Sequence, residues 1–307
     1  MQSKEKNTYK VMLCDAHIHY IPEELSIYTA FYKGVWTDKD KLNDHLDDYN
    51  IQKALLVYPS TDAYLKLEVF SRVCDIYNKA LEGIIKSNSK IIGAGIVDIE
   101  NLTTISEQVK ELKQRGFGAI SIASSYKGKF LVKELEPLFK SAQDNGLPIF
   151  IHPQTINPIG FDRVKDPLLM PVLEYSFDSS MFMGLLVMEG ILDRYDTRFI
   201  FSSLGGIIPF LKDRFDRVYS MLRERNIVKD IGNLPTQILK KVYVDTSGAS
   251  LQNIRLAIDL FGEDKLLWGS DYPVCGGLKD NLRMLDDLGK EIKGKITQDN
   301  FSNIFGK

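Results

Sequence analysis

The stretch VMLCDAHIHY, residues 11–20, joins a short apolar run to a polar segment that contains two histidines. The run VMLC has the length and the composition of a buried strand. The same arrangement, a short apolar run followed by a longer amphipathic stretch, recurs along the chain, which indicates repeated βα units. The predicted strands are residues 11–14, 53–58, 90–97, 117–123, 147–152, 198–203, 241–246 and 265–270.

The segments between these runs have helical periodicity. In residues 63–87 and 206–225 the apolar side chains recur every three or four positions, and charged side chains occupy the other faces. Strands that are apolar on both faces indicate a parallel sheet covered by helices. Eight units of about 38 residues each match a closed barrel, so we predict an α/β protein with a single (β/α)8 TIM barrel in one domain, residues 1–307. A doubly wound open sheet is the alternative, which the absence of GxGxxG after the first strand disfavours.

Composition excludes several classes of protein. A net charge of -2 in 307 residues gives no reason to expect nucleic acid or an anionic membrane as a partner. The three cysteines, at positions 14, 74 and 275, have no CxxC spacing, so neither a disulfide framework nor a thiolate metal site is indicated. Residues 1–10 are polar, and no apolar run approaches the length of a membrane span. We expect a soluble, cytoplasmic protein.

The two histidines of the opening stretch are placed to bind one metal ion. Alternate side chains of a strand share a face, so His17 and His19 project together, with Cβ atoms about 6 to 7 Å apart. A pair of surface or capping histidines is the alternative. His152 ends the fifth predicted strand and Asp271 follows the eighth, and the ends of parallel strands meet at one rim of a barrel. These four residues would form the shell of one Zn²⁺ or Mn²⁺ ion, with a position left for water or substrate.

Four strings resemble the amidohydrolase superfamily, in its branch of amidohydrolase-related barrel hydrolases and decarboxylases. They are DAHIHYIPEEL (15–25), IFIHP (149–153), SLGGIIPFL (203–211) and LLWGSDYPVCGG (266–277). The resemblance runs in the family's order from residue 13 to residue 277. It implies a (β/α)8 barrel, a metal held by His17, His19, His152 and Asp271, and a small-molecule substrate or water polarised by the ion. By analogy with the branch it also implies a homodimer.

One position departs from the family. The sixth strand of this branch usually ends in a histidine just before LGG, where Ser203 stands here. A serine hydroxyl is no general base near neutral pH unless another group takes its proton. His45, in the polar segment 37–50, is expected on a solvated helix face. We therefore expect Asp271 to move protons, and Ser203 to orient a substrate oxygen or a water.

Other polar residues are candidates for substrate binding. The fourth predicted strand has no lysine to bridge two ions, so the resemblance implies a mononuclear site. Lys127, beyond that strand, and Arg163, in the long segment after His152, are the predicted substrate-binding residues, since each could pair with a carboxylate. Asp245 could orient a ligand histidine or cap the next helix, and the string DTSG favours the cap.

The predicted function is metal-dependent hydrolysis of a small, carboxylate-bearing substrate by a metal-activated water. Non-oxidative decarboxylation is the alternative, because YIPEEL (20–25) resembles aminocarboxymuconate semialdehyde decarboxylase. Those enzymes keep the sixth-strand histidine, so its absence favours hydrolysis. A third reading is a catalytically impaired metal-binding barrel, with Ser203 marking the lost chemistry. The substrate is not specified by any of these residues.

Overall fold

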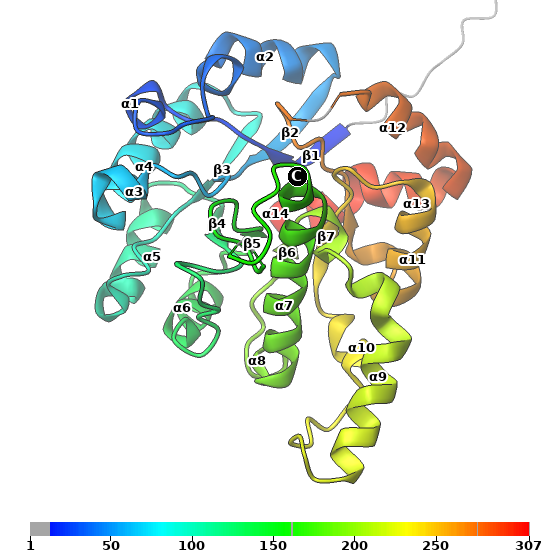
Figure 1. The fold of residues 1–307 in the computed structure, drawn as a ribbon. Coiled ribbons are helices and arrows are strands. Elements are labelled where there is room, and N and C mark those ends of the chain that lie inside the picture. Colours follow the sequence, from blue (N-terminus) through cyan, green and yellow to red (C-terminus); the bar gives the residue numbers. More distant parts are fainter. Residues whose placement is uncertain (1–12, 161, 275, 307) are drawn as a thin grey trace, which may run out of the picture.

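A computed structural model describes residues 13–160, 162–274 and 276–306. Residues 11 and 12 of the first predicted strand, and the third cysteine, lie outside them. Eight parallel strands form one sheet in the order β1 to β8, and helices surround it (Figure 1). The strands are β1 Leu13–Ile18, β2 Ile51–Leu56, β3 Ile91–Gly95, β4 Ala119–Ala123, β5 Ile149–His152, β6 Phe199–Phe201, β7 Tyr243–Asp245 and β8 Leu266–Leu267.

Helices follow the strands and cover the outside of the sheet. The α-helices are α1 Glu23–Ser26, α2 Lys39–Asp48, α3 Tyr64–Leu67, α4 Phe70–Ser87, α5 Ile105–Gln114, α6 Glu136–Asp144, α7 Tyr175–Met188, α8 Ile191–Arg194, α9 Ile208–Glu224, α10 Pro235–Leu239, α11 Leu251–Phe261, α12 Leu278–Met284, α13 Lys290–Gly294 and α14 Asn300–Phe305. The shorter 3₁₀ and π segments that matter below are η1 Gly34–Thr37, η3 Met170–Glu174 and η4 Ser203–Gly205.

Hydrogen bonds between β1 and the segment after β8 close the barrel. The Ala16 N–H donates to the Trp268 carbonyl at 2.8 Å. The Asp271 N–H donates to the His17 carbonyl, also at 2.8 Å. β8 is shorter than the predicted residues 265–270, and backbone hydrogen bonds to β1 continue beyond its end. The predicted (β/α)8 barrel is confirmed, and its closure brings Asp271 beside the two histidines of β1.

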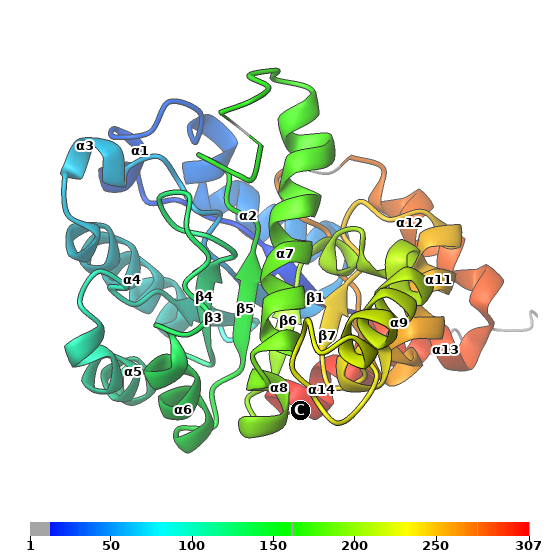
Figure 2. The ribbon, with the colours of Figure 1, turned by 60° about the horizontal axis from the view of Figure 1, so that its bottom comes forward.

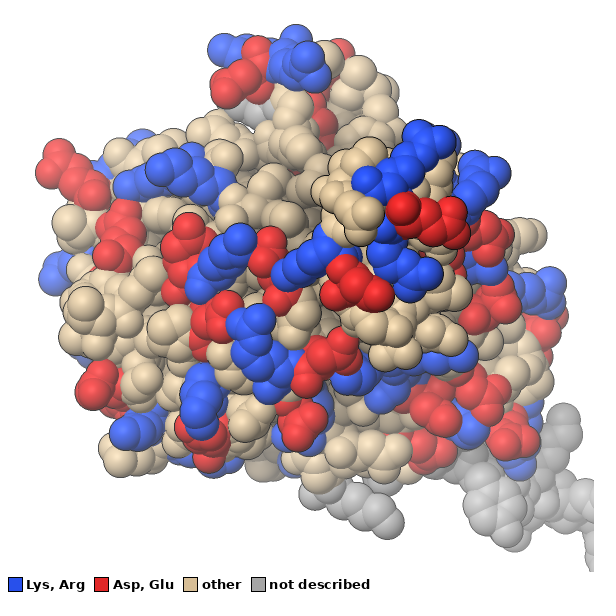
Figure 3. All heavy atoms as spheres, turned by 90° about the horizontal axis from the view of Figure 1, so that it is seen from below, with Lys and Arg blue, Asp and Glu red and all other residues tan. Residues whose placement is uncertain are grey.

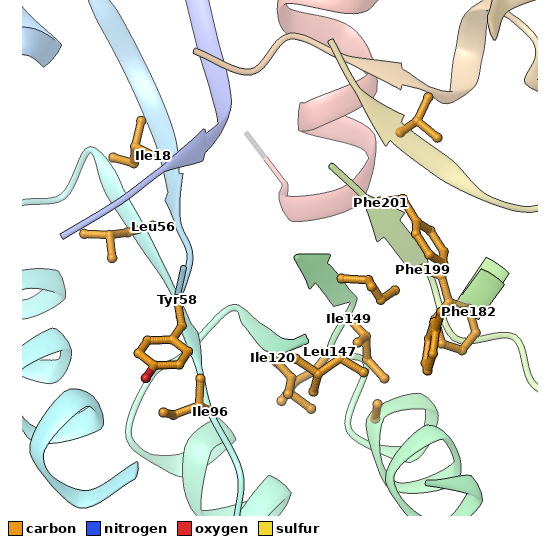
Figure 4. Close-up of a cluster of buried hydrophobic side chains, with 14 of the residues drawn as sticks. Ile18, Leu56, Tyr58, Ile96, Ile120, Leu147, Ile149, Phe182, Phe199 and Phe201 are labelled. Atoms are coloured by element: carbon orange, nitrogen blue, oxygen red, sulfur yellow. The ribbon is translucent and has the colours of Figure 1, made fainter. Parts of the chain in front are cut away.

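The core has an inner and an outer layer. Ile18, Leu56, Ile149 and Phe199 lie in the outer layer between strands and helices, and Phe182 of α7 packs in the same layer (Figure 4). α14 closes the end of the barrel opposite the loop that leads into α7, as Figure 2 shows. The inner layer consists of Cys14, Ala16, Leu55, Val57, Ala94, Ala119, Phe150, Ile200, Leu267, Phe301 and Ile304.

The two longest connections after strands lie at the other end. Residues 20–36 carry α1 and the start of η1, and residues 153–171 lead into η3 and α7 (Figure 2). On the face shown in Figure 3, acidic and basic side chains are interspersed. Within the described ranges no helix is long and apolar enough to cross a membrane. The homodimer, the cytoplasmic location and the single domain over residues 1–307 stay predictions.

Candidate active site

Three imidazoles meet at the carboxyl ends of the barrel strands. His17 lies near the end of β1, His19 directly follows that strand, His152 ends β5, and each of the three is buried. The Nε2 atoms of His17 and His19 are 3.0 Å apart. One ligand atom from each of the three imidazoles lies within 4.8 Å of those of the other two. Such a cluster can hold a single divalent metal ion.

The opposite nitrogen of each ring contacts an oxygen acceptor. His19 Nδ1 is 3.0 Å from the Val57 carbonyl, and His152 Nδ1 is 2.9 Å from the Pro153 carbonyl. His17 Nδ1 contacts a carboxylate in the same way. An acceptor at Nδ1 places the ring proton there and leaves the Nε2 lone pair for an ion. The three rings therefore share the tautomer that a metal site requires.

Asp245, at the end of β7, orients His17. Its Oδ2 lies 2.8 Å from His17 Nδ1, and the carboxylate is completely buried. Its Oδ1 accepts the Ser203 N–H at 2.9 Å and the Ser247 hydroxyl at 2.6 Å. The helix cap that DTSG indicated is supplied instead by Ser250, whose hydroxyl accepts from the N-terminus of α11. Of the two roles considered for Asp245, the contact with His17 is the one that the structure contains.

Asp271 adds a carboxylate oxygen to the cluster. Its Oδ1 is 3.1 Å from His19 Nε2 and 3.5 Å from His17 Nε2. The residue has φ 56°, a left-handed conformation that Asp tolerates better than most side chains. Gly269, two residues earlier, is required by close packing, since a Cβ there would lie 3.0 Å from His17 Cβ and 3.1 Å from Asp245 Cγ. The strand end is built to bring these groups together.

The electrostatics of the cluster favour one cation. Burial lowers the pKa of His17, but the Asp245 and Asp271 carboxylates outweigh it and raise that pKa to about 9. Burial and the two neighbouring imidazoles hold the pKa of His152 well below its usual value. Burial also lowers the pKa of His19. One proton is thus strongly held among several lone pairs, and a divalent ion suits the same position, because imidazole and carboxylate are both metal ligands.

A cavity of about 750 Å³ opens above the histidines. The two long connections wall it, with Phe31, Tyr32 and Trp36 from one and Ile156 from the other. The Trp36 ring stacks on His19 with 5.6 Å between centroids. The remaining lining residues are His17, His19, Ala30, Pro59, Asp62, His152, Pro153, Thr155, Pro167, Met170, Pro171, Tyr175, Ser176, Ser179, Ser202, Ser203, Gly206, Asp271 and Val274.

The end of β6 presents serines to this cavity. Ser203 is exposed, lines the cavity and has φ 48°, and Leu204 after it has φ 59°. Its Oγ lies 3.1 Å from the Ser247 Oγ. Ser202 Oγ is buried and has no hydrogen-bond partner among the described residues. Ser203 is linked to His17 through Ser247 and Asp245.

The two predicted substrate-binding cations lie elsewhere. The Lys127 ammonium pairs with the Glu100 carboxylate at 2.6 Å, and it does not line the cavity. Arg163 is exposed and does not line it either. No lysine or arginine appears among the cavity-lining residues in the part of the chain that the structure describes. Substrate binding by either residue stays a prediction, and this geometry gives it no support.

The prediction for His45 is wrong. It was expected on a solvated face of its helix, but it is buried, and it stacks on Tyr272 with 4.3 Å between centroids. Its Nε2 lies 3.4 Å from Ser270 Oγ and 3.7 Å from Asp15 Oδ2. Asp15 Oδ1 in turn accepts the Ser270 N–H at 3.0 Å. The fourth histidine therefore supports the backbone segment that carries Asp271.

Comparison with known proteins finds decarboxylases. The chain is 24% identical over 255 residues to 2-amino-3-carboxymuconate-6-semialdehyde decarboxylase of Dictyostelium discoideum, covering 80% of this chain and 70% of that protein. The fold resembles 5-carboxyvanillate decarboxylase of Novosphingobium aromaticivorans, solved with manganese and 4-hydroxy-3-methoxy-5-nitrobenzoic acid (TM-score 0.81, 20% identity, 97% of both chains). It also resembles 2,6-dihydroxybenzoate decarboxylase from Rhizobium (TM-score 0.79, 14% identity, 96% and 98%).

The expectation of hydrolysis is wrong. It rested on the serine at position 203, whereas the relative and both solved structures are decarboxylases. The physical reason is that activation of a water also requires a group that takes its proton. Loss of the sixth-strand histidine removes a proton-transfer group from either reaction, so its absence does not favour hydrolysis over decarboxylation.

The family match covers the whole barrel. The amidohydrolase family matches residues 14–307, a range that contains the four strings on which the resemblance was based. It also contains the histidine cluster and the carboxylates of β7 and of the segment after β8. The chain is therefore an enzyme of the amidohydrolase superfamily and belongs to the amidohydrolase family.

Proposed function

We propose that this protein is a metal-dependent, non-oxidative decarboxylase of a small, planar, unsaturated carboxylic acid. The observation that carries the proposal is the position of the donor cluster, in which one nitrogen from each of three imidazoles and one carboxylate oxygen meet beneath an aromatic-walled cavity. The named activities of the relative and of the structural neighbours support the reaction class. The ligands would be His17, His19, His152 and Asp271.

Zinc is the ion that we propose, because imidazole-rich sites of low coordination number suit zinc. Manganese is the second candidate, since it occupies the 5-carboxyvanillate decarboxylase structure and a carboxylate suits it. When bound, the ion would neutralise and polarise the substrate's oxygens. The fit of the donors rests on their Nδ1 contacts, which leave each Nε2 lone pair directed at the others.

The cavity favours a flat acid. Trp36, Tyr32 and Phe31 form an edge-to-face cluster, with 4.8 Å between the Tyr32 and Trp36 ring centroids. Aromatic rings of this kind bind planar ligands through offset or edge contacts. With no cationic side chain among the described lining residues, the charge of the substrate's carboxylate has to be balanced at the metal site.

Asp271 is the residue that we assign to proton transfer. Its side chain is 23% exposed, and it is in contact with the histidines on one side and the cavity on the other. In the reaction the bond between the carboxylate carbon and its neighbour breaks, CO₂ leaves, and the electron pair stays on the substrate carbon. Burial alone would raise the pKa of Asp271, but the neighbouring imidazoles hold it below its usual value, so the carboxylate rests ionised. It takes a proton from solvent and passes it to that carbon, which completes the new C–H bond and leaves the carboxylate ionised again. No oxidant or reductant is consumed.

The test is a screen of aromatic and unsaturated acids in D₂O with metal-loaded protein. We expect release of labelled CO₂ from a carboxyl-¹³C acid and one deuterium at the carbon that lost it. Asp271→Asn should lower turnover by at least a hundredfold, because it removes both the group that transfers the proton and one of the proposed metal ligands. Thr37→Ala, a substitution on η1 away from the cavity lining, is the matched control. Metal binding without turnover of any acid would contradict the proposal and favour the impaired barrel.

A further inference from the structure

We propose that Ser203 acts as a hydrogen-bond acceptor toward the substrate, so that the site selects acids bearing a hydroxyl or amino group. This inference rests on the proposed function and names a substrate class for the same cavity. It reverses the simpler expectation that a serine here would donate to a substrate oxygen. The hydrogen bonds behind Ser203 determine the direction.

The Ser247 hydroxyl donates its proton to Asp245. Asp245 Oδ1 accepts two backbone N–H groups, from Ser203 and from Ser247 itself, both at 2.9 Å. A backbone N–H can only donate, so this oxygen carries no proton of its own. The Ser247 hydroxyl lies 2.6 Å from the same oxygen and must therefore donate its single proton to it. Its remaining contacts have to be made as an acceptor.

The Ser203 hydroxyl donates in turn to the Ser247 oxygen. The two hydroxyl oxygens are 3.1 Å apart, so one of them must supply the proton between them. Since the Ser247 proton is directed to Asp245, the proton comes from Ser203. The lone pairs of Ser203 Oγ are then left for a ligand, because the residue is exposed and lines the cavity. The direction of the Ser203 O–H bond is therefore set by Asp245, the carboxylate that also orients His17.

The backbone keeps Ser203 in this place. Its N–H is bound to Asp245, and the 3₁₀ turn η4 runs through left-handed conformations at Ser203 and Leu204. Gly206 beyond them packs so closely that a Cβ would lie 2.1 Å from the Ser176 carbonyl. A segment held at both ends presents its hydroxyl at a fixed position.

A carboxylate lies in the wall of the same cavity. Asp62 is a lining residue, and its Oδ1 is buried without a hydrogen-bond partner among the described residues, while Oδ2 accepts the Ala30 N–H at 3.0 Å. A carboxylate brings no donor to the wall, so it adds to the preference for a substrate that supplies donors. An ether or a second carboxylate at Ser203 would instead bring lone pairs together and be rejected.

The experiment uses matched benzoates as probes. We would titrate 2-, 3- and 4-hydroxybenzoate, and the 2-, 3- and 4-fluorobenzoates of similar size, into protein loaded with the ion found by elemental analysis. Isothermal titration calorimetry gives each dissociation constant. At one ring position the hydroxyl acid should bind about five- to tenfold more tightly than its fluoro analogue, as one hydrogen bond allows. Ser203→Ala should reduce this ratio to about one.

The control is Ser176→Ala, which removes a different serine from the same cavity and should leave the ratio unchanged. A ratio that survives Ser203→Ala, or one that Ser176→Ala removes equally, would overturn the acceptor role of Ser203 and leave the proposed decarboxylation intact. If none of the six acids binds to the metal-loaded protein, the planar-acid function fails and the inference fails with it. Retained metal content in both variants shows that the site itself is still formed.

Discussion

Removing the metal should make the stability of the barrel sensitive to alkaline pH. In the metal-free protein Asp245 and Asp271 overcome the effect of burial and raise the pKa of His17 from 6.5 to about 9. A raised pKa means that the folded state holds the proton more tightly, so its stabilisation is complete below pH 6.5 and is lost as the pH rises through about 9. A difference of about 2.5 pH units corresponds to about 3 kcal/mol.

The assay is urea unfolding of chelator-treated protein at pH 6.5 and pH 9, followed by circular dichroism. For a chain of this size about 3 kcal/mol corresponds to a fall of about 1 M in the urea midpoint. His17→Gln should lack most of this fall, and metal-loaded wild type should gain most from the ion at pH 9, because protons no longer compete. Equal losses in metal-free wild type and in His17→Gln would show that the proton is not held at this ring, and would refute the reasoning.

Four further substitutions probe the groups around the cluster. Asp245→Asn should weaken metal binding about 10- to 100-fold in a competition titration, since it removes the charge that orients His17; unchanged affinity would contradict that role. His45→Phe keeps the stacking on Tyr272 but loses Nε2. It should lower metal affinity while the melting temperature changes little. Trp36→Ala should raise the dissociation constant of a bound ring acid about tenfold by calorimetry, and equal affinity would argue against the aromatic wall. Ser203→His separates a working site from an impaired one, because turnover that appears only in the variant would show that the chemistry had been lost.

The barrel and the meeting of the three histidines were predictable because they depend on local patterns. Eight apolar runs separated by amphipathic stretches are sufficient for a parallel barrel, and its geometry brings the ends of β1 and β5 to one rim. The positions of His17, His19 and His152 follow from the strand in which each residue stands. Only the boundaries moved, since pairing between β1 and the segment after β8 is a tertiary contact that no single run contains.

The residues that support the donors could not be read in the same way. The Asp245 carboxylate has the local signature of a helix cap, and its contact with His17 spans 228 positions in the sequence. His45 lies among charged residues in a polar segment, which is the pattern of a solvated face, yet packing against Tyr272 buries it. Such residues are recognisable only once the barrel has closed, because their partners belong to other strands.

The serine at the end of β6 shows how this affects the functional reading. Taken alone, the change from the family's histidine to Ser203 removes a proton-transfer group, and that reasoning led to hydrolysis. In the folded protein the serine is the end of a chain of hydrogen bonds that begins at His17 and passes through Asp245 and Ser247. A residue tied so directly to the histidine cluster is part of the site's construction, which argues for a changed substrate contact instead of simple loss of chemistry.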